Sequence, residues 1–93
     1  AKSGVEGLTV ALAAELAPNI RVNCIAPSLS KSKMAKNVIK NSKIEESLAK
    51  MHPLKRIGEG SDAASLSKFL LSTDSSWITG QIIGVDGGRS SIA

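Results

Sequence analysis

The apolar positions of this chain change their spacing several times, and each change predicts a different element. Four apolar residues among the first sixteen recur at the three- and four-residue spacing of one helix face: Val5, Leu8, Leu12 and Leu16. Pro18 ends this pattern, because proline disfavours the helical conformation of the residue before it. We therefore predict an amphipathic helix over residues 1–16. No capping residue precedes it, so we expect the chain to be a piece of a longer protein.

The next stretch changes to the alternation of a strand. In IRVNCIAP, residues 20–27, every second side chain is apolar or small: Ile20, Val22, Cys24 and Ala26. Ile25 falls on the other face, so we expect a strand that is covered on both sides, as in a parallel sheet. The run IIGV at residues 82–85 predicts a second short, buried strand.

A long excursion and a helix separate these two predicted strands. The apolar residues in the Lys- and Ser-rich segment 28–53 have helical spacing, which predicts one or two short helices. A further helix is expected over residues 61–72, with Ser61 or Asp62 as its capping residue. The order helix, strand, excursion, helix, strand is typical of the closing portion of a doubly wound α/β sheet, with an earlier strand upstream of residue 1.

Composition narrows the class of protein. The 93 residues are 42% hydrophobic but only 2% aromatic, so we expect one small core of Leu, Ile, Val and Ala. We expect no membrane segment, because no apolar run approaches the ~20 residues of a span. Cys24 is the only cysteine, which excludes an intrachain disulfide and a cysteine-based metal cluster and favours a reducing, cytoplasmic setting.

The net charge of +4 is unevenly distributed. Residues 31–56 contain eight of the twelve basic side chains and have a local charge of +6. Such a segment is typical of a solvated helix face or of a site for an anion. We favour the solvated face, because the lysines alternate with apolar residues in helical order. A nucleic-acid-binding domain is the least favoured interpretation, since no aromatic side chain lies among the lysines for base stacking.

Several single features could carry chemistry, but each has a simpler structural interpretation. The glycines of GVDGG, residues 84–88, predict a tight turn rather than a phosphate loop, because too few residues follow them to form the required helix. His52, next to Pro53, has no second histidine to complete a metal site and is expected on the surface or on a lid. Cys24 is expected to be a small core residue and Trp77 to bury its ring.

Three blocks of sequence resemble, in this order, the C-terminal part of the short-chain dehydrogenase/reductase family: AKSGVEGLTVALAAELAPNIRVNCIAPS, HPLKRIGEGSDAASLSKFLLS and SSWITGQIIGVDGG. The resemblance covers almost the whole chain except residues 31–51. It implies that residues 1–93 form the C-terminal part of a single Rossmann-like dinucleotide-binding domain, with residues 30–56 as a variable substrate-binding lid. It also implies an oxidoreductase that uses NAD or NADP to interconvert a carbonyl and an alcohol.

The resemblance assigns a catalytic role to Lys2. In the family a Tyr-x-x-x-Lys motif places both side chains on one helix face, and Lys2 matches its lysine. The tyrosine transfers the proton that accompanies hydride transfer, and the ammonium lowers the pKa of the tyrosine hydroxyl from ~10 toward the working pH. The lysine is also implied to hydrogen-bond the nicotinamide ribose. The matching tyrosine would lie three residues before Ala1, and the sequence contains no tyrosine.

The resemblance also implies a cofactor-binding loop directly after the first predicted strand. The family has Pro-Gly at this point and a threonine four residues after the glycine, whose backbone and hydroxyl groups bind the nicotinamide carboxamide. In PSLSKS, Pro27 matches, Ser28 replaces the glycine and Ser32 replaces the threonine. A side chain at position 28 penalises a positive φ. The cofactor-binding residues that we expect are Lys2, Pro27, Ser28, Ser30 and Ser32.

These expectations define a leading interpretation and an alternative. The Gly-rich fingerprint and the catalytic serine and tyrosine of the family lie upstream of its lysine, so we expect this chain alone to be inactive. Its full-length parent is expected to be a cytoplasmic homo-dimer or homo-tetramer that acts on a small carbonyl or alcohol. The alternative is a non-catalytic oligomerisation or binding module derived from the same fold. The sequence decides neither NAD against NADP nor the substrate.

Overall fold

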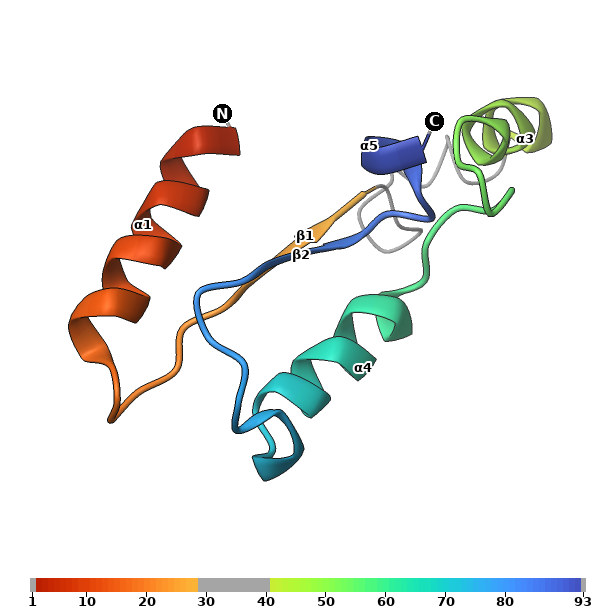
Figure 1. Ribbon diagram of the computed structural model, residues 1–93. Helices are drawn as coiled ribbons and strands as arrows, with labels where there is room; N and C mark the ends of the chain where they lie inside the picture. The colour runs from red at the N-terminus through yellow and green to blue at the C-terminus, as the bar shows by residue number, and fades with distance from the viewer. Residues whose placement is uncertain (1, 29–40, 93) are drawn as a thin grey trace. The chain divides into compact units, whose positions relative to one another are not determined.

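A computed structural model of the chain describes residues 2–28 and 41–92, with side chains from residue 4 onward. The elements are, in order, α1 (Lys2–Leu16), β1 (Cys24–Pro27), α3 (Ser42–Lys50), α4 (Gly60–Leu70), the 3-10 helix η2 (Thr73–Ser75), β2 (Ile82–Val85) and α5 (Arg89–Ile92) (Figure 1). They divide into two compact units, one of residues 1–26 and 65–83 and the other of residues 27–64 and 84–93.

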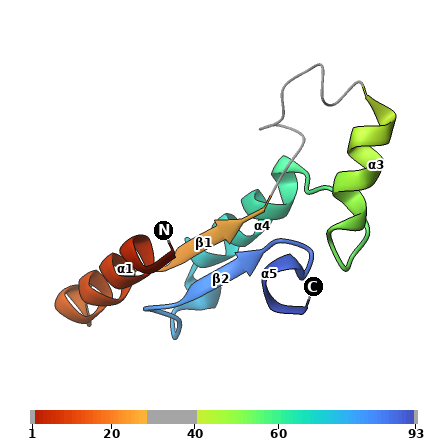
Figure 2. The same ribbon diagram turned by 90° about the horizontal axis from the view of Figure 1, so that it is seen from above.

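The two strands form a parallel pair and point in the same direction (Figure 2). The Cys24 N–H donates to the Gln81 carbonyl at 2.8 Å, and the Ser28 N–H donates to the Val85 carbonyl at 3.2 Å. Each strand advances by four residues between these two bonds, as a parallel register requires. Parallel strands need a long crossover, which here contains α3 and α4. The predicted α/β class is confirmed.

The first strand is shorter than the alternating pattern predicts. Residues 20–23 precede β1 and bond to the segment before β2 through a side chain as well as the backbone. The Val22 N–H donates to the Thr79 hydroxyl at 3.0 Å, and the Val22 carbonyl accepts from the Gly80 N–H at 2.8 Å. Because a hydroxyl takes the place of a backbone carbonyl here, the regular ladder begins only at Cys24.

In the first unit, α1 and the C-terminal half of α4 lie on opposite sides of the strand pair (Figure 1). Among residues 4–16 of α1, the buried positions are Thr9 and Ala13, one turn apart, and the Thr9 hydroxyl donates to the Val5 carbonyl at 2.8 Å. Val5 and Leu8, which were predicted on the buried face, are 60% and 59% exposed. That part of the prediction is wrong, because the contact is made by small side chains: Ala13 faces Gly80.

Arg21 connects the segments of the first unit through its guanidinium group. It donates four hydrogen bonds, at 2.9–3.3 Å, to the carbonyls of Leu70, Ser72 and Ile78 and to the hydroxyl of Ser75. Leu70 is the last residue of α4, where helix carbonyls lack partners and favour a positive charge. The buried Ser75 hydroxyl donates to two of the same carbonyls. Arg21 therefore caps α4 from 49 residues away in the sequence.

We expect Arg21→Met to lower the free energy of unfolding by about 2–3 kcal/mol, because partly buried carbonyls lose their donors. Arg21→Lys should recover only part of this loss, since an ammonium lacks the planar fork that serves several acceptors at once. Urea unfolding followed by circular dichroism measures both. Lys43→Met, at an exposed position of α3, is the matched control and should change stability by less than about 0.5 kcal/mol. Equal values for Arg21→Met and the control would contradict the role of Arg21.

The second unit contains α3, the turn that follows it and the start of α4. Asn41 caps α3, since its side-chain oxygen accepts from the N–H groups of Lys43 and Ile44 at 3.1 and 3.2 Å. Asp62 accepts from the Glu59 N–H at 2.7 Å, which is the backward bond of a capping box at the start of α4. Both the helix within the excursion and the capping role of Asp62 are confirmed.

Lys55 adopts a left-handed backbone conformation, which is energetically unfavourable for a residue that has a side chain. Its φ is +60°, in the left-handed region, where it forms a turn with its N–H donating to the His52 carbonyl at 2.8 Å. A Cβ clashes with the backbone in this region, and glycine avoids the clash. The turn after α3 therefore contains local strain at Lys55.

We expect Lys55→Gly to raise the free energy of unfolding by about 0.5–1 kcal/mol, because relief of the left-handed strain exceeds the added flexibility of the unfolded chain. Lys55→Ala is the matched control, since it also loses the 3.5 Å bond from the Lys55 ammonium to the Lys50 carbonyl but keeps the Cβ. Thermal unfolding of both variants tests this difference. Alanine stabilising as much as glycine would show that strain at Lys55 is not the cause.

Candidate functional site

The structure describes only part of the predicted site. Lys2 is the first residue of α1, and its side chain lies outside the described part of the chain. Ser30 and Ser32 also lie outside the described residues. Pro27 and Ser28 are described: Pro27 is the last residue of β1, and Ser28 follows it at the carboxyl end of the strand. Lys2 belongs to the first compact unit, and Pro27 and Ser28 belong to the second.

Ser28 continues the strand pairing without the conformation that glycine would allow. Its N–H donates to the Val85 carbonyl at 3.2 Å, and it is not among the described residues with a positive φ. A serine therefore fits this position without left-handed strain. Its hydroxyl oxygen lies 3.0 Å from Nε2 of His52.

His52 is buried, with 2% of its surface exposed, so the predicted position on the surface is wrong. Its Nδ1 lies 2.9 Å from the Leu48 carbonyl, one turn earlier along the chain. A carbonyl can only accept, so Nδ1 carries the proton of the neutral ring and Nε2 accepts from the Ser28 hydroxyl. The ring can be buried because both nitrogens have partners. The pair spans 24 residues, so a single histidine beside a proline gave no sign of it.

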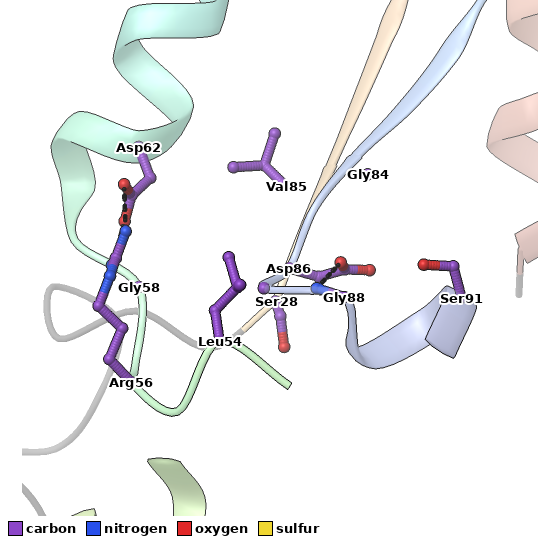
Figure 3. Close-up of a pocket in the computed structure, with 11 residues that line it drawn as sticks. Ser28, Leu54, Arg56, Gly58, Asp62, Gly84, Val85, Asp86, Gly88 and Ser91 are labelled. Atoms are coloured by element: carbon purple, nitrogen blue, oxygen red, sulfur yellow. Dashed lines mark hydrogen bonds and ion pairs between the residues drawn. The ribbon is translucent and has the colours of Figure 1, made fainter. Parts of the chain in front are cut away.

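The ends of both strands border a cavity of about 410 Å³ in the second unit (Figure 3). Ser28 and Val85 contribute from the strands, and Asp86 and Gly88 from the turn after β2. The side chains of Arg56 and Asp62 face each other on another side of it, with Leu54 near Ser28 (Figure 3). The cavity is therefore polar at its rim and lies at the carboxyl edge of the sheet, where α/β proteins bind ligands.

Arg56 and Asp62 form a two-pronged ion pair at this rim. The two guanidinium nitrogens lie 2.8 and 2.9 Å from the two carboxylate oxygens. The hydrogen bond from Arg56, followed by that from the Glu59 N–H, lowers the pKa of Asp62 from 3.8 to about 2. The same bond raises the pKa of Arg56. Each charge is thus neutralised by the other at neutral pH.

The turn after β2 is held by Asp86. Its carboxylate accepts from the Gly88 N–H at 2.9 Å, from the Ser90 N–H at 3.3 Å and from the Ser90 hydroxyl. The Ser90 hydroxyl, and then the two N–H groups, lower the pKa of Asp86. Gly87 and Gly88 have φ of +62° and +88°. The tight turn predicted from GVDGG is confirmed. The expectation that too few residues follow it to form a helix is wrong, because the short helix α5 follows directly.

Two further residues have simpler roles. Trp77 is 100% exposed, so the prediction that it buries its ring is wrong. Its connection is held instead by backbone groups, such as the Ile78 carbonyl that accepts from Arg21. Cys24 is half-buried and lies on β1. Within residues 2–28 and 41–92, no group of three or more His, Cys, Asp or Glu side chains is placed to hold a metal ion, and no helix is long and apolar enough to cross a bilayer.

Comparison with known proteins identifies the family to which this chain belongs. Residues 1–90 match the family described as enoyl-(acyl carrier protein) reductase, a class of oxidoreductases. The chain is 44% identical over 90 residues to tropinone reductase-like 3 of Erythroxylum coca, covering 97% of this chain and 35% of the relative. It belongs to the short-chain dehydrogenase/reductase family and matches the C-terminal part of that family.

Solved structures of the family share the fold. A short-chain type dehydrogenase/reductase from Mycobacterium ulcerans has a TM-score of 0.82 and 38% identity, over 95% of this chain and 32% of that one. A gluconate 5-dehydrogenase from Burkholderia cenocepacia J2315, in complex with NADP and tartrate, has a TM-score of 0.84 and 28% identity, over 99% and 36%. The chain spans about a third of the length of these relatives.

We expect Arg56→Gln to raise the pKa of Asp62 from about 2 toward 3.8, though not fully, because the Glu59 N–H bond persists. A lowered carboxyl pKa stabilises the fold above pH 3.8, and the stabilisation is lost as the pH falls to about 2. The difference in melting temperature between wild type and variant should therefore vanish near pH 2. Carboxyl ¹³C NMR titration gives the pKa directly. Lys50→Gln, which removes the exposed pair with Glu46, should leave Asp62 unchanged.

Proposed function

We propose that the protein to which this chain belongs is an NAD- or NADP-dependent oxidoreductase that interconverts a carbonyl and an alcohol. The observation that carries the proposal is the family match over residues 1–90. The names of two relatives support it: one is called tropinone reductase-like 3, and the other is a gluconate 5-dehydrogenase whose structure contains NADP. Because the chain spans about a third of those proteins, the activity is proposed for the full-length protein.

We assign the catalytic role on this chain to Lys2, at the start of α1. A helix places a residue four positions earlier on the same face, one turn away. In the proposed enzyme a tyrosine at that position exchanges the proton with the substrate oxygen, and the Lys2 ammonium lowers the pKa of the tyrosine hydroxyl toward the working pH. The 93 residues contain no tyrosine, so we expect them to be inactive by themselves.

Lys2, Pro27, Ser28, Ser30 and Ser32 are the proposed cofactor-binding residues. The described pair, Pro27 and Ser28, fits a nicotinamide carboxamide by position, since it ends β1 at the carboxyl edge of a parallel pair. The Ser28 N–H already donates to the Val85 carbonyl, and the Ser28 hydroxyl already donates to Nε2 of His52. A hydroxyl oxygen has two lone pairs, so Ser28 can still accept from the carboxamide NH₂. The bound nicotinamide supplies or takes up the hydride.

The domain, lid, assembly and location belong to the same proposal. Residues 1–93 would form the C-terminal part of a single Rossmann-like domain, with residues 30–56 as the lid over a small carbonyl or alcohol. A homo-dimer or homo-tetramer is supported by apolar side chains that α1 exposes: Val5, Leu8 and Val10. A cytoplasmic location is supported by the free thiol of Cys24. These exposed side chains equally favour the second candidate, a non-catalytic oligomerisation module.

We expect Lys2→Ala in the full-length protein to lower kcat by about 10²–10⁴-fold, the usual contribution of acid–base catalysis. In the direction of alcohol oxidation the rise of kcat/KM with pH should move to higher pH, because the tyrosine loses the neighbouring ammonium. Lys2→Arg, which keeps the charge, should have an intermediate effect. Lys68→Ala, on the exposed face of α4, is the control and should have none.

Steady-state kinetics with NADH and NADPH against a panel of carbonyl compounds measures these effects. Turnover that is insensitive to Lys2→Ala would contradict the assignment of Lys2. A stable oligomer that turns over none of the panel with either cofactor would favour the non-catalytic module.

A further inference from the structure

His52, in the turn after α3, is a buried side chain that contacts the segments following both strands. From β1, the Ser28 hydroxyl bonds to Nε2 at 3.0 Å. From the turn after β2, Gly87 lies against His52: a Cβ at Gly87 would lie 3.4 Å from the His52 Cβ and 3.7 Å from the ring atom Cδ2. The Leu54 N–H donates to the Gly87 carbonyl at 3.0 Å and closes the same contact. All of these residues lie within the second compact unit.

The bond between Ser28 and His52 has a defined direction. The Nδ1–H group donates a hydrogen bond to the Leu48 carbonyl, so Nε2 has a lone pair that points at Ser28. With the ring 2% exposed, water cannot readily replace Ser28 as the partner of Nε2. No buried side-chain nitrogen or oxygen among the described residues lacks a partner, and this pair contributes to that result. Removing either side chain would leave a buried polar atom unpaired.

Ser28 is where this bond reaches the proposed cofactor site. Its backbone is fixed by the bond to Val85, and its side chain by the bond to His52, so two directional bonds hold one residue. Two such bonds hold both the N–H and the side chain of residue 28, whereas a glycine at this position would offer only the first. Ser28, which replaces the glycine of the family, thus has a buried hydrogen-bond acceptor in His52, 24 residues later.

We propose that His52 is a positioning residue that acts through Ser28, and that the pair sets the affinity for the nicotinamide cofactor by fixing the carboxyl end of β1. The proposal rests on the proposed function, because it concerns the same cofactor site. A group that is held before the cofactor arrives loses less conformational freedom on binding, so affinity falls when the pair is broken. Hydride and proton transfer depend on other groups, so kcat at saturating cofactor should change little.

The test uses substitutions that separate the two ring nitrogens of His52. Asparagine can replace Nδ1 as donor to Leu48 but cannot reach Ser28, whereas glutamine can place an acceptor near the position of Nε2. We expect Ser28→Ala and His52→Asn each to raise the Kd for NADH or NADPH by about 10-fold in the full-length protein. For His52→Asn, which removes no group that contacts the cofactor, kcat should stay within about 2-fold. The double variant should bind no more weakly than either single variant. His52→Gln should stay close to wild type.

Calorimetric titration with NADH and NADPH gives the Kd values. Ser75→Ala is the matched control, because it removes a buried serine hydroxyl in the first unit; it should lower the melting temperature and leave Kd unchanged. Additive losses in the double variant, or a Kd that stays at the wild-type value while stability falls, would overturn the positioning role.

The ring nitrogens of His52 give an independent readout, and their signals in the full-length protein are those that His52→Asn removes. In ¹⁵N NMR its signals should show the form protonated at Nδ1, and Ser28→Ala should shift Nε2 more than Nδ1. A ring that exchanges between both tautomers in the wild type would overturn the pair itself. A pair with the expected NMR signature in a protein that binds neither cofactor would overturn the proposed function, and with it the cofactor role of His52, but not the bond.

Discussion

The parallel pairing of β1 with β2 is the constraint on which the other features depend. Two parallel strands cannot be joined by a hairpin, so the chain must leave the carboxyl end of β1 and return to the start of β2. It does so through α3 and α4. The same pairing places the carboxyl ends of both strands at one edge, where Ser28, the Asp86 turn and His52 lie together. The position of the candidate site therefore follows from the direction of the two strands.

Directional polar bonds hold much of this small structure. The buried residues include Thr9, His52 and Ser75 beside the apolar Ala13, Ile57 and Leu70. Each of these buried polar groups has hydrogen-bond partners. Some hydrogen bonds also join residues that are distant in sequence: Arg21 donates to carbonyls around the end of α4, and Ser28 bonds to His52. Losing such a bond leaves a buried atom unpaired, which costs more than losing a surface contact. These bonds connect segments that have little hydrophobic area to share.

The family match and the described geometry support the proposed function in different ways. The match supports the type of reaction, from which the role of Lys2 is proposed, whereas the described geometry concerns Pro27 and Ser28 at the end of β1. At that end, this chain has a serine paired with a buried histidine where the family resemblance implies a glycine. The proposed enzyme would thus keep the chemistry of its family but hold the start of the cofactor loop by the hydrogen bond between Ser28 and His52.

The sequence alone determined the features that depend on neighbours along the chain. Helical spacing and Pro18 bounded α1, the apolar run 82–85 defined β2, and paired glycines after Asp86 predicted the tight turn. Tertiary structure decided which faces are covered. Val5, Leu8 and Trp77 are exposed and His52 is buried, all against the sequence pattern. Hydrophobicity records what a side chain prefers, but burial depends on which distant groups fill its space and satisfy its hydrogen bonds.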